Sequence, residues 1–146
     1  MVVDANIILS VVLGRRSHPV FAEVIAARSV VTSARAAEVV RHVLRSVPHL
    51  PPAAIELAEA LLDGIEVVPQ VAFADRLELA SCVLAAAVAS RDGSVSDAHH
   101  LACARILTAD VWSHDRDFAG TGWPAWSNAN LHRAISTETE IDSTDV

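Results

Sequence analysis

The chain has 146 residues, of which 52% are hydrophobic, and its formal net charge at pH 7 is −7. This length suits a single domain with a sizeable core, and the negative charge argues against a broad basic surface for DNA. All 11 residues in the lysine-plus-arginine count are arginine. The absence of lysine excludes a P-loop and Schiff-base catalysis.

Predicted strands alternate with predicted helices along the chain. Short β-branched or apolar runs predict strands at residues 2–4, 30–32, 65–68 and 111–113. Apolar spacing, caps and turn residues predict helices at residues 7–13, 19–27, 33–46, 51–64, 75–90 and 97–108. The alternation is typical of parallel βαβ units, so we expect one α/β domain over residues 1–135. Residues 136–146 are acidic and turn-rich, and we expect them to form a flexible tail.

Neither a secretory signal nor a membrane span is expected. The apolar start of the chain has no basic segment, and the longest apolar run is far shorter than the roughly 18 residues of a membrane helix. Cys82 and Cys103 lie in apolar helical patterns, which favours reduced thiols in a core over a disulfide framework. We therefore expect a cytoplasmic protein.

Acidic residues lie at the ends or starts of several predicted elements. Asp4 ends the first predicted strand, and Asp115 and Asp117 follow the last one. Asp97 lies in the first turn of a predicted helix, and Glu38 lies in the second turn of another. Sites in open parallel sheets form beyond the carboxyl ends of the strands, so these side chains can converge.

Converging carboxylates need a proton or a cation, because like charges held together repel. Three or four oxygen donors with open positions suit Mg²⁺ or Mn²⁺, which retain water ligands and bind phosphate oxygens. Such ions activate water and stabilise the departing oxygen of a phosphodiester. Metal-dependent phosphodiester hydrolysis is therefore the chemistry that such a cluster would serve.

Four motifs occur in an order and at a spacing that resemble the PIN domain family. They are Asp4-Ala5-Asn6 after an apolar start, Glu38 within residues 36–40, Asp97 within residues 97–104, and residues 113–118. The resemblance implies a three-layer α/β fold, with a central, mostly parallel β-sheet flanked by α-helices. It also implies a Mg²⁺- or Mn²⁺-dependent ribonuclease that acts on RNA, often as the toxin of a VapBC-type pair. A cognate antitoxin and a homodimer are the partners it implies.

The resemblance assigns roles position by position. The residues that match the family's catalytic acids are Asp4, Glu38, Asp97 and Asp115. Of these, Asp4, Asp97 and Asp115 match metal ligands, and the auxiliary positions are Asp117, Asn6 and Ser113. Ser113 stands where threonine is commoner, and residues 108–110 occupy a turn where the family usually has glycine. We expect the four catalytic acids to gather in one pocket.

Each acid also has an ordinary structural interpretation. Asp4 can cap the following helix, and Asp97 can interact with its helix dipole. Glu38 can pair with Arg41, three residues further along the helix. Asp115 and Asp117 can be turn residues. The order of all four motifs together favours the catalytic interpretation.

Other candidate sites are weaker. His99 and Cys103 share a helix face, but a structural zinc site needs about four ligands. His114 adjoins the predicted site, although an exposed loop histidine is the simpler interpretation. Loop arginines can bind RNA phosphates through bidentate bonds, and the candidates are Arg15, Arg16 and Arg116. Trp123 and Trp126 can stack on bases, although packing over the sheet edge is the commoner role.

The sequence is therefore compatible with three functions. The first is a metal-dependent endoribonuclease of the toxin kind. The second is an inactive PIN-like module that binds RNA or a partner protein, and the third is a structural α/β domain whose acids never meet. The presence of all the matching acids favours the enzyme, because an inactive module does not need clustered charge.

Overall fold

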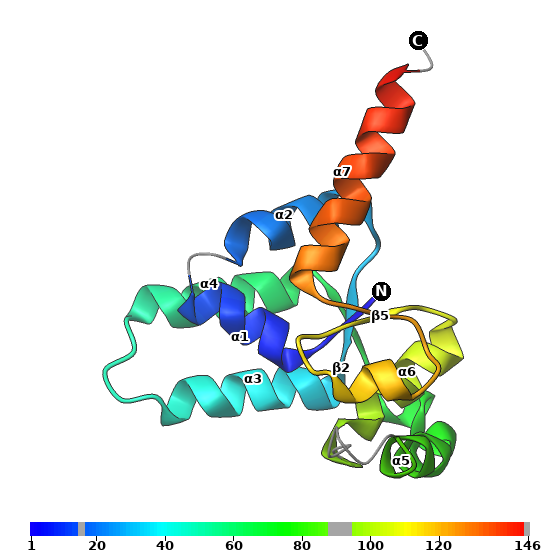
Figure 1. Ribbon diagram of the computed structural model, residues 1–146. Coiled ribbons are helices and arrows are strands. Elements are labelled where there is room, and N and C mark those ends of the chain that lie inside the picture. The colour runs from blue at the N-terminus through cyan, green and yellow to red at the C-terminus, as the bar shows by residue number, and fades with distance from the viewer. Residues whose placement is uncertain (15–16, 88–94, 145–146) are drawn as a thin grey trace.

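The computed structural model describes residues 1–14, 17–87 and 95–144. Its sheet has five strands in the order β3-β2-β1-β4-β5. Figure 1 shows the helices arranged around this sheet. The strands are β1 (Val2–Val3), β2 (Val31–Ser33), β3 (Glu66–Val68), β4 (Val111–Trp112) and β5 (Ala125–Trp126). Every pairing is parallel. The predicted α/β fold with a central parallel sheet between helices is confirmed.

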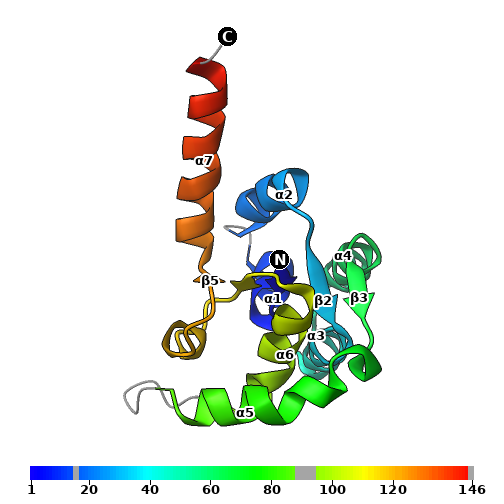
Figure 2. The same ribbon diagram turned by 90° about the vertical axis from the view of Figure 1, so that its right-hand side faces the viewer.

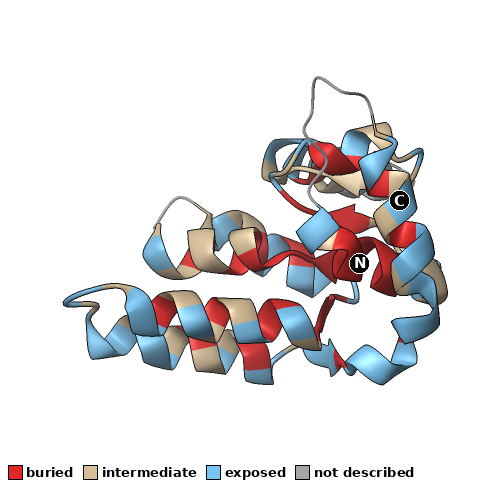
Figure 3. Ribbon diagram, turned by 90° about the horizontal axis from the view of Figure 1, so that it is seen from below, coloured by how far each residue is buried: buried red, intermediate tan, exposed pale blue. Residues whose placement is uncertain are grey.

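Helices cover both faces of the sheet (Figure 2). One face carries Val3 and Trp112 and packs on α1 (Ala5–Leu13), α2 (His18–Ala27), α3 (Ala34–Ser46), α4 (Pro52–Asp63) and α7 (Asn128–Thr144). The other face carries Val2 and Val111 and packs on α5 (Leu77–Ala85) and α6 (Ala98–Leu107). Successive strand residues point to opposite faces, so both residues of β1 and both residues of β4 are buried, whereas Val68 is the buried residue of β3. Figure 3 shows the buried residues gathered where helices meet the sheet.

Most predicted elements are present, with shifted ends. The strand predicted at residues 2–4 ends at Val3, and Asp4 caps α1 instead. The helix predicted at residues 75–90 spans only Leu77–Ala85, after a 3-10 turn at residues 74–76. Its predicted last residues, 88–90, lie outside the described residues. Ser33 caps α3, because its hydroxyl accepts a 3.1 Å hydrogen bond from the Ala36 N–H.

The C-terminal segment is helical as far as Thr144. Residues 136–144 continue α7, which crosses the expected domain boundary after residue 135. Neither α7 nor β5 was predicted. α7 packs against α2, with Leu131 buried and Glu138 paired with Arg28. These tertiary contacts outweigh the modest helix propensity of a segment rich in serine and threonine.

Two further findings bear on the initial expectations. No helix in the described parts of the chain has both the length and the apolar character needed to cross a bilayer. Both cysteines are free thiols. Cys103 is completely buried, and burial raises the pKa of its thiol to about 11. Cys103 therefore behaves as a core residue.

Candidate metal centre at the carboxyl edge of the sheet

The strand order reverses between β1 and β4. The chain places β2 and β3 on one side of β1 and later adds β4 and β5 on the other. Ligands of open α/β sheets bind beyond the carboxyl ends of the strands at such a switch point. Val3 is paired in register with Trp112, so the next residues, Asp4 and Ser113, leave the sheet side by side. The Asp4 N–H also donates to the Trp112 carbonyl at 2.9 Å.

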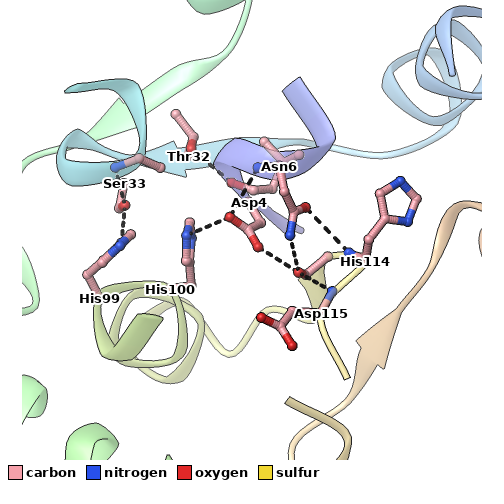
Figure 4. A network of polar contacts seen from close by, with 11 residues as sticks. Asp4, Asn6, Thr32, Ser33, His99, His100, His114 and Asp115 are labelled. Atoms are coloured by element: carbon pink, nitrogen blue, oxygen red, sulfur yellow. Dashed lines mark hydrogen bonds and ion pairs between the residues drawn. The ribbon is translucent and has the colours of Figure 1, made fainter. Parts of the chain in front are cut away.

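The Asp4 carboxylate is buried and accepts hydrogen bonds on both oxygens (Figure 4). Oδ2 accepts from the Ser113 hydroxyl at 2.6 Å, and Oδ1 lies 2.9 Å from His100 Nε2. Oδ1 also accepts from the Asn6 N–H at 3.3 Å, so Asp4 is a helix cap as well. Burial opposes ionisation of Asp4, but the bonds from His100, Ser113 and Asn6 prevail and lower its pKa. The side chain is therefore held as a carboxylate.

Ser113 is the junction between this carboxylate and the loop after β4. Its hydroxyl oxygen accepts hydrogen bonds from Asn6 Nδ2 at 3.1 Å and from the Asp115 N–H at 2.9 Å. Its O–H donates a hydrogen bond to the Asp4 carboxylate. The Asp117 N–H then donates to Asp115 Oδ1 at 2.9 Å. These bonds fold the loop so that its two acidic side chains lie on the same side as Asp4.

Three acids form a tight cluster beside this network. One carboxylate oxygen each from Asp97, Asp115 and Asp117 lies within 4.8 Å of the others. Asp117 is buried, and the other two are half-buried. Burial raises the pKa of Asp97, and the charges of Asp4, Asp115 and Asp117 raise it further. A divalent cation would remove this repulsion, so the donor set fits Mg²⁺ or Mn²⁺.

Glu38 occupies a different place. Its exposed carboxylate pairs with Arg35 at 3.4 Å. Arg41, the partner that the ordinary structural interpretation gave to Glu38, instead pairs with Glu59 of α4 at 2.9 Å. Among the described residues, Glu38 is absent from the groups of closely spaced metal-ligating atoms. It lines a hollow of about 430 Å³ that also reaches Arg35 and His99.

Two histidines at the start of α6 complete the centre. The rings of His99 and His100 lie 4.0 Å apart, and His99 Nδ1 is 2.8 Å from the Ser33 hydroxyl. Burial, helped by His100, lowers the pKa of His99 to about 3, so its ring is neutral. Sequence reasoning considered His99 only with Cys103 and missed His100. The available signal was the three-residue spacing from Asp97 to His100, which places both on one helix face.

The remaining candidates that the structure describes lie in the loop after β4 and at the edge of the sheet. Arg116 and His114 are exposed in the loop after β4, whereas Arg15 and Arg16 lie outside the described residues. Trp123 Nε1 donates to the Ala109 carbonyl at 2.9 Å, and Trp126 Nε1 donates to Asp110 at 2.7 Å. Both indoles are thus packed at the sheet edge, as the simpler interpretation predicted. Asp97 occupies the N-cap position of α6.

Comparisons with known proteins agree with this architecture. A family profile described as the PIN domain matches residues 2–136. The crystal structure of FitAcB from Neisseria gonorrhoeae is similar, with a TM-score of 0.66 and 14% identity over 88% of this chain and 97% of that one. The structure of FitAB bound to the IR36 DNA fragment gives a TM-score of 0.65 and 14% identity over 87% and 94% of the two chains. No curated protein matches the sequence.

Proposed function

The chain belongs to the PIN domain family, and from this premise we propose that it is a metal-dependent endoribonuclease. The observation that carries the proposal is the cluster of Asp97, Asp115 and Asp117, whose oxygens lie within 4.8 Å of one another at the switch point of the sheet. Clustered carboxylates repel unless a proton or a cation offsets their charge, and a bound divalent ion would supply that cation. A purely structural domain has no need of this arrangement.

The chain's own residues would divide the work as follows. Asp97, Asp115 and Asp117 would hold Mg²⁺ or Mn²⁺, which when bound supplies Lewis-acid activation of water and of the phosphodiester. Ser113 and Asn6 would orient the loop that presents Asp115. Asp4 lies beside the cluster and already accepts three hydrogen bonds. Direct metal binding by Asp4 therefore stays a sequence-based prediction.

Exposed arginines would position the RNA. Arg35 and Glu38 line two adjoining hollows, one of which continues along α3 past His42 and Arg45. The other reaches Ala98 and His99 at the start of α6, next to Asp97. Guanidinium groups along this path would bind phosphates and offset the net negative charge of the chain. Glu38 would then contact the RNA strand beside the metal rather than the metal itself, and Arg116 would contact RNA from the loop after β4.

The toxin–antitoxin assignment is part of the same proposal. It is supported by the family resemblance and by the likeness to FitAcB and FitAB, the second of which is bound to DNA. A nuclease toxin held by a DNA-binding antitoxin would occur in this kind of assembly. The alternative is an inactive module that binds RNA or a partner protein, and retention of the clustered acids argues against it.

The test is cleavage of a fluorescent single-stranded RNA with Mg²⁺, with Mn²⁺ or with chelator. We expect cleavage only with a divalent ion, and its loss in Asp115→Asn. The matched control is Asp63→Asn, which removes an exposed carboxylate at the end of α4. RNA binding without cleavage under any of these conditions would support the inactive module instead.

A further inference from the structure

Two buried imidazoles approach Asp97 from its own helix. One ligand atom each from Asp97, His99 and His100 lies within 4.8 Å of the others. This group shares Asp97 with the acidic cluster but brings nitrogen where that cluster has only oxygen. Figure 4 shows the two rings side by side, His99 beneath Ser33 and His100 reaching Asp4.

The hydrogen bonds of His100 leave one ring nitrogen without a partner. Nε2 faces the Asp4 carboxylate at 2.9 Å, so Nε2 carries the proton that is donated. Nδ1 is then a lone-pair atom, and this buried atom has no hydrogen-bond partner among the described residues. The side chain is 1% exposed. Buried polar atoms are almost always satisfied, so an unsatisfied one requires an explanation.

A metal ion supplies that explanation. Metal-binding histidines commonly donate their second N–H to a carboxylate, which fixes the tautomer and aims the other nitrogen at the ion. Asp4 stands in this relation to His100. Asp4 would then act on the metal through His100, as a positioning residue.

His99 is held in a matching way. Its Nδ1 is 2.8 Å from the Ser33 hydroxyl oxygen, which also accepts from the Ala36 N–H at 3.1 Å. In the tautomer whose Nδ1–H donates to that oxygen, the lone pair of His99 lies on Nε2 and is free to bind a metal ion. Both rings are thus fixed by buried partners at the carboxyl edge of the sheet.

We propose that Asp97, His99 Nε2 and His100 Nδ1 form a second metal position, which takes a divalent transition-metal ion in preference to Mg²⁺. The affinity of sites with imidazole ligands rises from Mn²⁺ through the later transition-metal ions to Cu²⁺, whereas Mg²⁺ prefers oxygen ligands. Two histidines and one carboxylate leave coordination sites open for water or phosphate. The proposal adds a second ion to the proposed nuclease centre. The catalytic use of this ion rests on the proposed function, whereas its binding does not.

The test is pulsed electron paramagnetic resonance of the full chain loaded with Mn²⁺. We expect hyperfine coupling to imidazole ¹⁴N, which changes to ¹⁵N coupling when the protein is labelled with ¹⁵N-histidine. The signal should persist in excess Mg²⁺. It should be lost in His99→Gln and in His100→Gln, and it should remain in His114→Ala, which removes the exposed neighbouring imidazole.

Three results would overturn the proposal: no imidazole coupling in the labelled wild type, coupling that survives in both glutamine variants, or coupling abolished by His114→Ala. The labelled wild type keeps the test decisive even where a variant unfolds, which thermal melts in chelator would reveal. Cleavage of RNA without nitrogen coupling would refute this site and leave the proposed function intact. Nitrogen coupling without cleavage of RNA would support this site and refute the proposed function.

Discussion

Replacing Ser113 by alanine removes the junction of the polar network. The hydroxyl makes one 2.6 Å bond to the Asp4 carboxylate and accepts two others, at 3.1 and 2.9 Å. A hydrogen bond to a charged group contributes about 1.5–3 kcal/mol and a neutral one about 0.5–1.5 kcal/mol. The two neutral donors are half-buried and can turn to water, so we expect Ser113→Ala to lower the free energy of unfolding by about 3 kcal/mol. At about 3 °C per kcal/mol for a domain of this size, the melting temperature falls by about 10 °C.

The loss should also depend on pH. The Ser113 bond helps to lower the pKa of Asp4. A lowered carboxyl pKa stabilises the fold above the unfolded pKa of about 3.9, and this stabilisation disappears as pH falls through the folded value. Ser113→Ala should therefore cost most near neutral pH and least in strong acid.

Urea denaturation in chelator, at several pH values, measures this effect. Ser113→Thr keeps the hydroxyl and should stay close to wild type. Ser10→Ala removes a hydroxyl whose only described bond is to the Ile7 carbonyl, at 2.7 Å, and controls for a generic serine loss. A cost for Ser113→Ala below about 0.5 kcal/mol, or equal to that of Ser10→Ala, would refute the network's role.

Three further predictions follow from other parts of the chain. Thr108 has φ 49° and ψ 43°, in the left-handed region that is unfavourable for a β-branched residue. Thr108→Gly should therefore raise the free energy of unfolding by about 1 kcal/mol. A melting temperature of Thr108→Gly no higher than that of Thr108→Ala would contradict this prediction. The pKa of His99 falls from 6.5 to about 3 on folding, so the neutral ring stabilises the fold above pH 6.5 and this stability is lost as pH drops toward 3. In chelator, His99→Gln should flatten the pH dependence of unfolding across that window, and an unchanged slope would count against a buried neutral ring. Arg35→Ala should weaken RNA binding about fivefold to tenfold and lower the slope of log affinity against log salt concentration by about 1. Fluorescence anisotropy in chelator measures both effects. An equal effect of Arg133→Ala, on α7, would rule out a specific RNA path along α3.

Local signals explain which parts of the fold were predictable. Ser33 caps α3, and Pro52 and Gly64 mark the two ends of α4, because caps and breakers act within a few residues. The strands β1 and β4 were recognisable as apolar runs because both of their faces are buried. β5 and α7 were missed because their stability comes from distant partners, such as Arg28 for Glu138.

The site was predictable in its residue types more than in its geometry. The motif order placed Asp97 and Asp115 together, and the structure brings them within 4.8 Å. The motif order could not show that Asp117 joins this cluster, because that depends on how the loop after β4 folds. Nor could it show that Glu38 pairs with Arg35, because that depends on how α3 is oriented. His100 was missed because its importance comes from its contact with Asp4, 96 positions away in the sequence.

Asp97→Asn tests most directly whether the clustered carboxylates at the switch point hold a metal for RNA cleavage. The substitution keeps the shape of the side chain and removes the charge shared by both groups of ligands. Because burial and neighbouring acids raise the pKa of Asp97, its contribution to stability is lost as pH rises, and the apo variant should melt higher than wild type at pH 7. The measurement is single-turnover cleavage of RNA with Mn²⁺, run beside thermal melts in chelator. A loss of about two orders of magnitude or more in rate, with a melting temperature unchanged or higher, is the predicted result. Cleavage at the wild-type rate by a folded Asp97→Asn would contradict the catalytic assignment.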